Sequence, residues 1–190
     1  ASGVEKQYTF DGDELILNGK ASWVYYEEIL GRPSRYRAFW WSPDSKSIAF
    51  YRFDNSQVPM FPIYDAKGQH GTLTQTRYPK AGDTNPSVKV GFVEVGNVRS
   101  RDIPVVVWAD FDEKEDQYFG IPYWSGDSRL FILPWMPREQ NQMCIYQVNP
   151  KDGSRSPIYD ETQPTWIDWV TEGHFTGEGM YMVRDFSLWE

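Results

Sequence analysis

Two adjacent glutamates, Glu27 and Glu28, are the residues of this sequence best suited to chemistry. They follow an aromatic-rich and otherwise uncharged segment, residues 23–26. An unpaired carboxylate in such a setting loses hydration and needs a cationic partner. Two neighbouring carboxylates can accept charge-assisted hydrogen bonds from one ammonium group. The pair therefore predicts a binding site for the amine of a ligand.

The same two glutamates could instead lie on a solvated helix face that binds no ligand. They would then form surface ion pairs with the arginines that follow, and such pairs contribute little to stability. Those arginines are Arg32, Arg35 and Arg37. The residue types alone leave both interpretations open.

One short helix is expected to carry the pair. Ser22 would be its N-cap, residues 23–30 its body, and Gly31 followed by Pro33 its stop. On an α-helix the two glutamates would lie about 100° apart, so both carboxylates could converge on one ligand. Tyr25, on the same helix, would either line the ligand pocket or pack the helix onto the rest of the fold.

Three segments share a pattern that would build the scaffold around this helix. Each has an aromatic residue, a hydroxyl residue, a tight turn and then an apolar strand, which is typical of a β-hairpin. They are residues 41–50, 124–133 and 175–183. The starts of the three segments are 83 and 51 residues apart. The second interval is close to one β-propeller blade of about 40 to 50 residues, and the first would hold one blade with long insertions.

The remaining segments divide into loops and strands. Residues 58–64 and 78–86 are rich in proline and are predicted to be ordered loops. Apolar or alternating runs predict strands at residues 88–95, 105–108 and 143–148, with a turn at 149–153.

The composition limits the fold and the partners. The chain has 190 residues with 9 Trp, 12 Tyr, 11 Phe, 13 Pro and 15 Gly, which favours an all-β protein. Its net charge of -8 argues against nucleic acid and anionic membranes as partners, because these need a basic face. Cys144 is the only cysteine, and His70 and His174 lie far apart. We therefore expect no metal site and no cofactor.

Several motifs, taken in order, resemble the N-terminal propeller of the dipeptidyl peptidase IV family. They are Trp23-Val24-Tyr25-x-Glu27-Glu28, Trp41-Ser42-Pro43, Val58-Pro59, Tyr78-Pro79-Lys80-Ala81-Gly82 and Asn85-Pro86. The resemblance is strongest over residues 18–95 and continues more weakly to residues 166–175. In that family an eight-bladed β-propeller covers an α/β-hydrolase domain.

The resemblance implies a role for each candidate residue. Glu27 and Glu28 would hold the free amino terminus of a peptide substrate, with Tyr25 and Trp169 as further substrate-binding residues. Buried packing is the alternative for Trp169. Tyr26 departs from the family pattern, since many relatives have a third glutamate there. The parent would be a serine-type peptidase that releases N-terminal di- or tripeptides next to proline, outside the cytoplasm.

Other parts of that machinery are not expected within residues 1–190. The chain has no Gly-x-Ser-x-Gly motif, so it would supply no catalytic residue and should be inactive alone. At roughly 45 residues per blade it would hold about four blades of the eight, a partial β-propeller with one short helix. Its partners would be the substrate's amino terminus and the parent's α/β-hydrolase domain. Open blade edges and faces predict self-association.

Two rival functions remain at this point. A non-catalytic propeller could bind protein partners through its blade faces. A sugar-acting enzyme would need two carboxylates across a cleft rather than side by side, which makes it the least favoured.

Overall fold

The computed structural model describes residues 5–96, 103–170, 173–176 and 179–184 of the chain. Within these ranges, helical geometry is confined to residues 23–29 and 32–34, and the rest is strand, turn and loop. The predicted all-β class is therefore confirmed. No helix in the described ranges is long and apolar enough to cross a membrane.

The first sheet has five antiparallel strands in the order β1-β3-β6-β7, with β2 also paired to β3. Its members are β1 (Ile16–Asn18), β2 (Phe39–Trp41), β3 (Ser47–Asp54), β6 (Ser87–Glu94) and β7 (Val107–Trp108). Strand β6 pairs with the whole length of β3. Strands β1 and β2 therefore share the other edge of β3, one after the other.

The second sheet repeats this plan. Its order is β12-β11-β10-β8, with β9 also paired to β10. Its members are β8 (Gln117–Phe119), β9 (Tyr123–Trp124), β10 (Phe131–Pro137), β11 (Gln142–Val148) and β12 (Arg155–Thr162). Strands β8 and β9 share one edge of β10 as β1 and β2 share one edge of β3. The two sheets are thus copies of one structural unit.

The predicted hairpin pattern has the same turn chemistry in both sheets. In the first, Ser42 Oγ donates to Asp44 Oδ1 at 2.6 Å and accepts from the Ser47 backbone N–H at 2.9 Å. The second sheet repeats both bonds, at 2.7 and 2.9 Å, with Ser125, Asp127 and Leu130. The hydroxyl residue and the aspartate are therefore fixed by the turn, as the sequence predicted.

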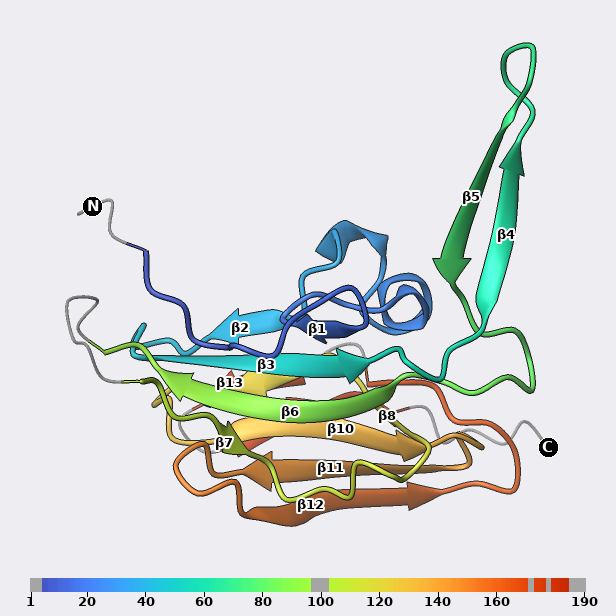
Figure 1. Ribbon diagram of the computed structural model, residues 1–190. Helices are drawn as coiled ribbons and strands as arrows, with labels where there is room; N and C mark the ends of the chain where they lie inside the picture. Colours follow the sequence, from blue (N-terminus) through green and yellow to red (C-terminus); the bar gives the residue numbers. More distant parts are fainter. Residues whose placement is uncertain (1–4, 97–102, 171–172, 177–178, 185–190) are drawn as a thin grey trace.

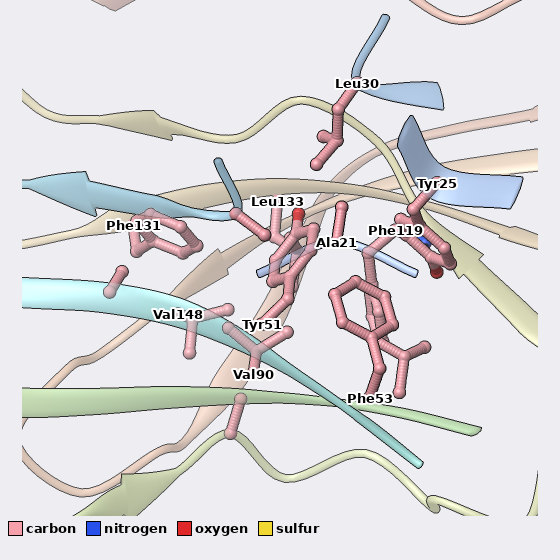
Figure 2. Packing of buried hydrophobic residues seen from close by; sticks show 14 of the residues in the cluster. Ala21, Tyr25, Leu30, Tyr51, Phe53, Val90, Phe119, Phe131, Leu133 and Val148 are labelled. Atoms are coloured by element: carbon pink, nitrogen blue, oxygen red, sulfur yellow. The ribbon is translucent and has the colours of Figure 1, made fainter. Parts of the chain in front are cut away.

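The main hydrophobic cluster lies between the two sheets, which stack one over the other (Figures 1 and 2). Tyr51 and Val90 from the first sheet are buried with Phe131 and Leu133 from the second. Alternate residues of β3 and β6 reach this cluster, as expected of strands that bury one face. Tyr51 Oη also donates to the Gly120 carbonyl at 2.6 Å, which joins the sheets by a polar contact.

A second cluster occupies the other face of the second sheet. Ile132 and Met136 of β10 pack there with Met180 and Met182 of β14. Strand β14 (Gly179–Met182) forms a hairpin with β13 (Gly173–Thr176). Sheets stacked face to face in this way are the blades of a partial propeller, as predicted.

The expected number of blades was too high. Instead of about four, the described residues form two five-stranded blades and the β13-β14 hairpin. Insertions account for the difference, because residues 20–37 and the β4-β5 hairpin lengthen the first repeat. The prediction that the 83-residue interval holds one blade with long insertions is confirmed.

The β4-β5 hairpin corrects one predicted loop. Strands β4 (Met60–Asp65) and β5 (Thr72–Arg77) pair along their full lengths, and Figure 1 shows them standing away from the sheets. Pro62 lies within β4, opposite Gln75. A two-stranded ribbon consists only of edge strands, where a proline that donates no hydrogen bond is tolerated. The predicted loop at residues 78–86 is confirmed.

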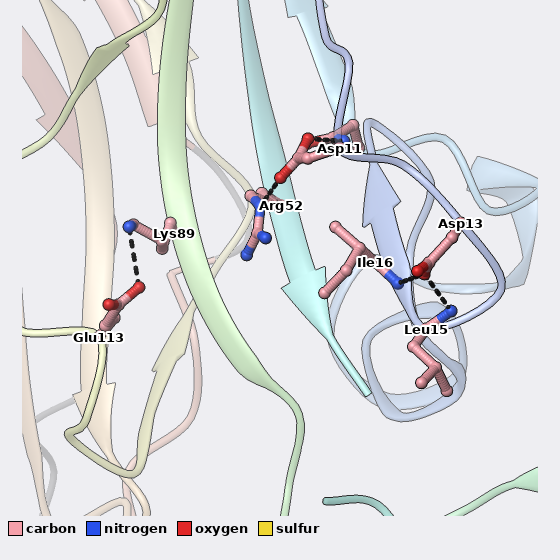
Figure 3. Close-up of polar contacts among 8 residues, drawn as sticks. Asp11, Asp13, Leu15, Ile16, Arg52, Lys89 and Glu113 are labelled. Atoms are coloured by element: carbon pink, nitrogen blue, oxygen red, sulfur yellow. Dashed lines mark hydrogen bonds and ion pairs between the residues drawn. The ribbon is translucent and has the colours of Figure 1, made fainter. Parts of the chain in front are cut away.

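Two ion pairs lie on the face of the first sheet that points away from the main cluster (Figure 3). Arg52 Nε donates to Asp11 Oδ2 at 2.7 Å, which ties the N-terminal segment to β3. Lys89 Nζ lies 2.8 Å from Glu113 Oε2, which ties β6 to the loop before β8. Arg52 pairs with Asn18 of β1, so the Asp11 contact lies beside the strand that leads into the glutamate-bearing segment.

Candidate functional site

Glu27 and Glu28 lie on an excursion that interrupts the first edge of the first sheet. The Gly19 N–H donates to the Tyr51 carbonyl at 2.9 Å, and the Tyr51 N–H donates to the Ala38 carbonyl at 2.9 Å. The Ala38 N–H also donates to the Gly19 carbonyl at 3.0 Å. The chain therefore leaves and re-enters the sheet opposite a single residue, and residues 20–37 form the excursion.

The predicted helix exists but has a different geometry. Tyr25–Ile29 form a π-helical turn, closed by the Leu30 N–H, which donates to the Tyr25 carbonyl at 2.7 Å. The Ser22 hydroxyl does not cap it, and the Ser22 carbonyl instead accepts from the Tyr26 N–H at 3.0 Å. The predicted N-cap is wrong: Val24 is the capping residue, and the buried Ser22 hydroxyl has no hydrogen-bond partner in the described part of the chain. Single π-turns occur frequently at functional sites.

Tyr25 anchors this turn in the core rather than facing solvent. Its side chain is 1 % exposed and packs edge-on against Phe53, with ring centroids 4.6 Å apart. The Tyr25 hydroxyl accepts a hydrogen bond of 3.0 Å from the Phe119 backbone N–H (Figure 2). Burial raises the pKa of Tyr25 far above its usual value, so the hydroxyl stays neutral. Of the two roles predicted for Tyr25, the structure gives it the packing role.

The two glutamates differ in exposure and in partners. The Glu27 side chain is 18 % exposed, and its Oε2 accepts from Arg32 Nε at 2.7 Å. Arg32 was one of the three arginines named as possible ion-pair partners. Glu28 is exposed, and no hydrogen bond or ion pair joins it to any other described residue. One carboxylate is thus held in place beside another that is open to a ligand.

Tyr36, which the sequence reasoning did not single out, contacts the same turn. Its ring stacks on that of Tyr26, with centroids 3.8 Å apart and planes 13° from parallel. Aromatic residues ten apart in a loop give no recognisable signal of stacking. Only the fold of residues 31–37 brings them together.

A hollow of about 610 Å³ lies at the base of the excursion. Trp23 and Tyr36 line it from the excursion, and Met60 and Arg77 line it from the β4-β5 hairpin. Trp23 also packs edge-on against Tyr78, with ring centroids 5.8 Å apart. Neither Glu27 nor Glu28 lines this hollow.

Trp169 packs in a different hydrophobic cluster from the glutamate-bearing turn. It belongs to the second cluster, whereas Tyr25 belongs to the cluster on the opposite face of the second sheet. The Trp169 ring lies against Gly120, where an added Cβ would be 2.7 Å from Trp169 Cε3. Partly buried and packed on a backbone, Trp169 fits the packing alternative better than a ligand contact.

The chemistry that the turn offers is the binding of a cation. Two side-by-side carboxylates provide four acceptor oxygens, of which one is already occupied by Arg32. A primary ammonium has three N–H donors, which could form hydrogen bonds to oxygens of both carboxylates. Among the described residues, no group of three His, Cys, Asp or Glu side chains is arranged to hold a metal ion.

The sequence matches a known family over nearly its whole length. Residues 1–187 match the family model described as the dipeptidyl peptidase IV (DPP IV) N-terminal region. Dipeptidyl peptidase 4 from Felis catus is 32 % identical over 195 residues, covering 94 % of this chain and 25 % of the relative. Inactive dipeptidyl peptidase 10 from Rattus norvegicus is 32 % identical over 162 residues, covering 84 % of this chain and 20 % of that protein.

A solved structure has the same fold. The crystal structure of Porphyromonas gingivalis dipeptidyl peptidase 4 superposes with a TM-score of 0.77 at 25 % sequence identity. The match covers 93 % of this chain and 26 % of that one. The chain therefore spans about a quarter of the length of these relatives.

Proposed function

This chain belongs to the family of the dipeptidyl peptidase IV N-terminal region, and from that premise we propose that it is the substrate-anchoring propeller segment of a serine-type exopeptidase. Glu27 and Glu28 bind the free amino terminus of a peptide. The parent's α/β-hydrolase domain performs the cleavage and releases N-terminal di- or tripeptides next to proline.

The observation that carries this proposal is the difference between the two glutamates. Glu28 is exposed without a partner in the described part of the chain, beside a Glu27 that Arg32 fixes. A terminal ammonium can donate to both, whereas an internal peptide N–H is a single uncharged donor. Such an anchor selects free amino termini and limits how far a peptide can enter.

Kinetics of the full-length protein test this proposal. The substrates are Gly-Pro-p-nitroanilide and its N-acetylated form, and the variants are Glu27→Gln and Glu28→Gln. Each variant should lower kcat/KM for the free amine by about tenfold or more, because a charge-assisted bond contributes about 1.5–3 kcal/mol. Glu139→Gln, at an exposed position of the second blade, is the matched control. Unchanged turnover by both glutamate variants would refute the anchoring role.

A second candidate function is a non-catalytic propeller that binds protein partners. One relative, 32 % identical to this chain, is itself named inactive dipeptidyl peptidase 10. The same assay separates the two candidates. A folded full-length protein that releases no p-nitroaniline from any proline-containing substrate would favour the non-catalytic function.

A further inference from the structure

Residues 31–37 fold back over the π-turn in an unusual conformation. After a 3₁₀ turn at Arg32–Ser34, both Arg35 and Tyr36 have positive φ angles, 51° and 65°. The Arg37 N–H donates to the Ser34 carbonyl at 2.9 Å and closes a β-turn around them. Two successive positive φ angles define a type I′ turn, which normally takes Asn-Gly. Side chains larger than glycine are strained there, so other contacts must hold the turn in place.

Those contacts centre on Tyr36. Its ring stacks on Tyr26 with centroids 3.8 Å apart, and its carbonyl accepts from the Ala21 N–H at 2.8 Å. A bridge between Lys20 and Arg37 closes the base of the excursion beside it. The strained turn therefore places one aromatic ring flat against the residue that immediately precedes Glu27.

Arg32, which also belongs to residues 31–37, contacts Glu27, the residue after Tyr26. Its Nε donates to Glu27 Oε2 at 2.7 Å. Two side chains of residues 31–37 thus engage two successive residues of the π-turn, Tyr26 by stacking and Glu27 by an ion pair. Glu28 follows directly and makes no such contact among the described residues, so its direction depends on how the turn is held.

We propose that Tyr36 and Arg32 are positioning residues for the amine anchor, a role that rests on the proposed function. Neither residue contacts the ligand. Tyr36 fixes the backbone of the turn through Tyr26, and Arg32 fixes the Glu27 carboxylate. Together they present the remaining carboxylate oxygens of Glu27 and Glu28 to one ammonium group.

The test uses the full-length protein with Gly-Pro-p-nitroanilide and compares Tyr36→Leu with Tyr36→Phe. Phenylalanine keeps the stacked ring, whereas leucine removes it. Tyr36→Leu should raise KM by about three- to tenfold with kcat within about twofold, because it weakens a contact present in both ground and transition states. Tyr36→Phe should keep the wild-type KM. A leucine variant with wild-type KM, or a phenylalanine variant as impaired as leucine, would overturn the role of Tyr36.

Arg32 provides a variant whose folding is not at issue, because its side chain is 74 % exposed. Arg32→Gln should raise KM about two- to fivefold, since solvent already screens its charge and the main loss is the fixed Glu27 orientation. In a Glu27→Gln background the same substitution should change nothing further. Additive effects of Arg32→Gln and Glu27→Gln would show that Arg32 does not act through Glu27 and would overturn its assignment.

The N-acetylated substrate separates failure of this inference from failure of the proposed function. If the wild-type protein cleaves both substrates equally well, the amine anchor itself is absent and both proposals fall. If the wild-type protein discriminates but the Tyr36 and Arg32 variants keep its KM, the anchor stands and only the positioning role is wrong.

Discussion

The Tyr25 hydroxyl lies 3.0 Å from the Phe119 backbone nitrogen and accepts its hydrogen bond across 94 positions of sequence. This bond joins the turn that carries Glu27 and Glu28 to the first edge of the second blade. The Trp124 indole N–H makes a parallel link when it donates to the Trp40 carbonyl at 3.1 Å. The glutamate pair is therefore positioned by both blades and not by its own excursion alone.

Loss of the Tyr25 hydroxyl should destabilise the fold. Tyr25→Phe leaves the buried Phe119 N–H without its acceptor, which costs about 1–3 kcal/mol. Chemical denaturation monitored by tryptophan fluorescence measures the change. Tyr64→Phe, on the β4-β5 hairpin where Tyr64 is 65 % exposed, is the control and should leave stability unchanged. Equal stability of wild type and Tyr25→Phe would contradict the linking role of this bond.

Gly153 should tolerate no side chain. Its φ is 77°, and an added Cβ would collide with the Trp108 carbonyl oxygen. Gly153→Ala should therefore lower the free energy of unfolding by about 2 kcal/mol or more. Gly126→Ala is the matched control, since nothing lies within 4 Å of the position of its Cβ. A Gly153→Ala variant as stable as Gly126→Ala would show that the β7 segment does not pack there.

A fall in pH should weaken the ion pair between Glu161 of β12 and Arg184, two residues beyond β14. Burial alone would raise the pKa of Glu161, but hydrogen bonds from Arg184 Nε at 2.9 Å and Tyr159 Oη at 3.0 Å outweigh it and lower the pKa. A carboxyl whose pKa is lower in the folded state stabilises the fold above its unfolded pKa, about 4.3. That stabilisation is lost as the pH falls through the folded pKa.

The measurement is the difference in unfolding free energy between wild type and Glu161→Gln as a function of pH. The difference should be constant near neutral pH and shrink as the pH is lowered below about 4.3. Glu139→Gln, an exposed glutamate, should show no comparable trend. A difference that does not change with pH would mean that Glu161 is not held by Arg184 in the folded state.

Residues 1–190 alone should self-associate. Phe39 and Trp41 are 37 % and 50 % exposed at one edge of the first blade, and Met60, Tyr64 and Leu73 are exposed on the β4-β5 hairpin. Apolar surface of this kind, beside unpaired strand edges, favours contact between copies. Light scattering over a range of concentrations should give a mass above that of one chain. A monomeric mass at the highest concentration would contradict the prediction.

Local patterns predicted the scaffold of this molecule well. The aromatic, hydroxyl and turn residues of residues 41–50 and 124–133 form hairpins with the same side-chain bonds, because these bonds involve residues at most five apart. The buried face of β6 followed from period-two alternation. Cys144 is 3 % exposed in a central strand, as its apolar neighbours indicated.

Features that depend on distant contacts were not predictable in the same way. The π-turn at Tyr25–Ile29 is held by a hydrogen bond to Phe119. Helix propensities do not distinguish a π-turn from an α-helical turn, so the sequence predicted only a helix there. The proline at position 62 correctly indicated that this segment is not a central strand of a blade. It did not indicate whether the segment is a loop or, as found, part of a two-stranded ribbon. Tyr36 has a positive φ angle, which residue type does not predict for tyrosine, and it stacks on a ring ten residues earlier, so its place beside the glutamates could not be predicted from the sequence.

The most direct test of the amine anchor is calorimetric titration of the full-length protein with the dipeptide Ile-Pro and with N-acetyl-Ile-Pro. Wild type should bind Ile-Pro at least about tenfold more tightly than the acetylated form, and Glu28→Gln should reduce this preference although Glu27 remains. Equal affinity for the two forms in wild type, or an undiminished preference in Glu28→Gln, would contradict the assignment of Glu28 as the open half of the anchor.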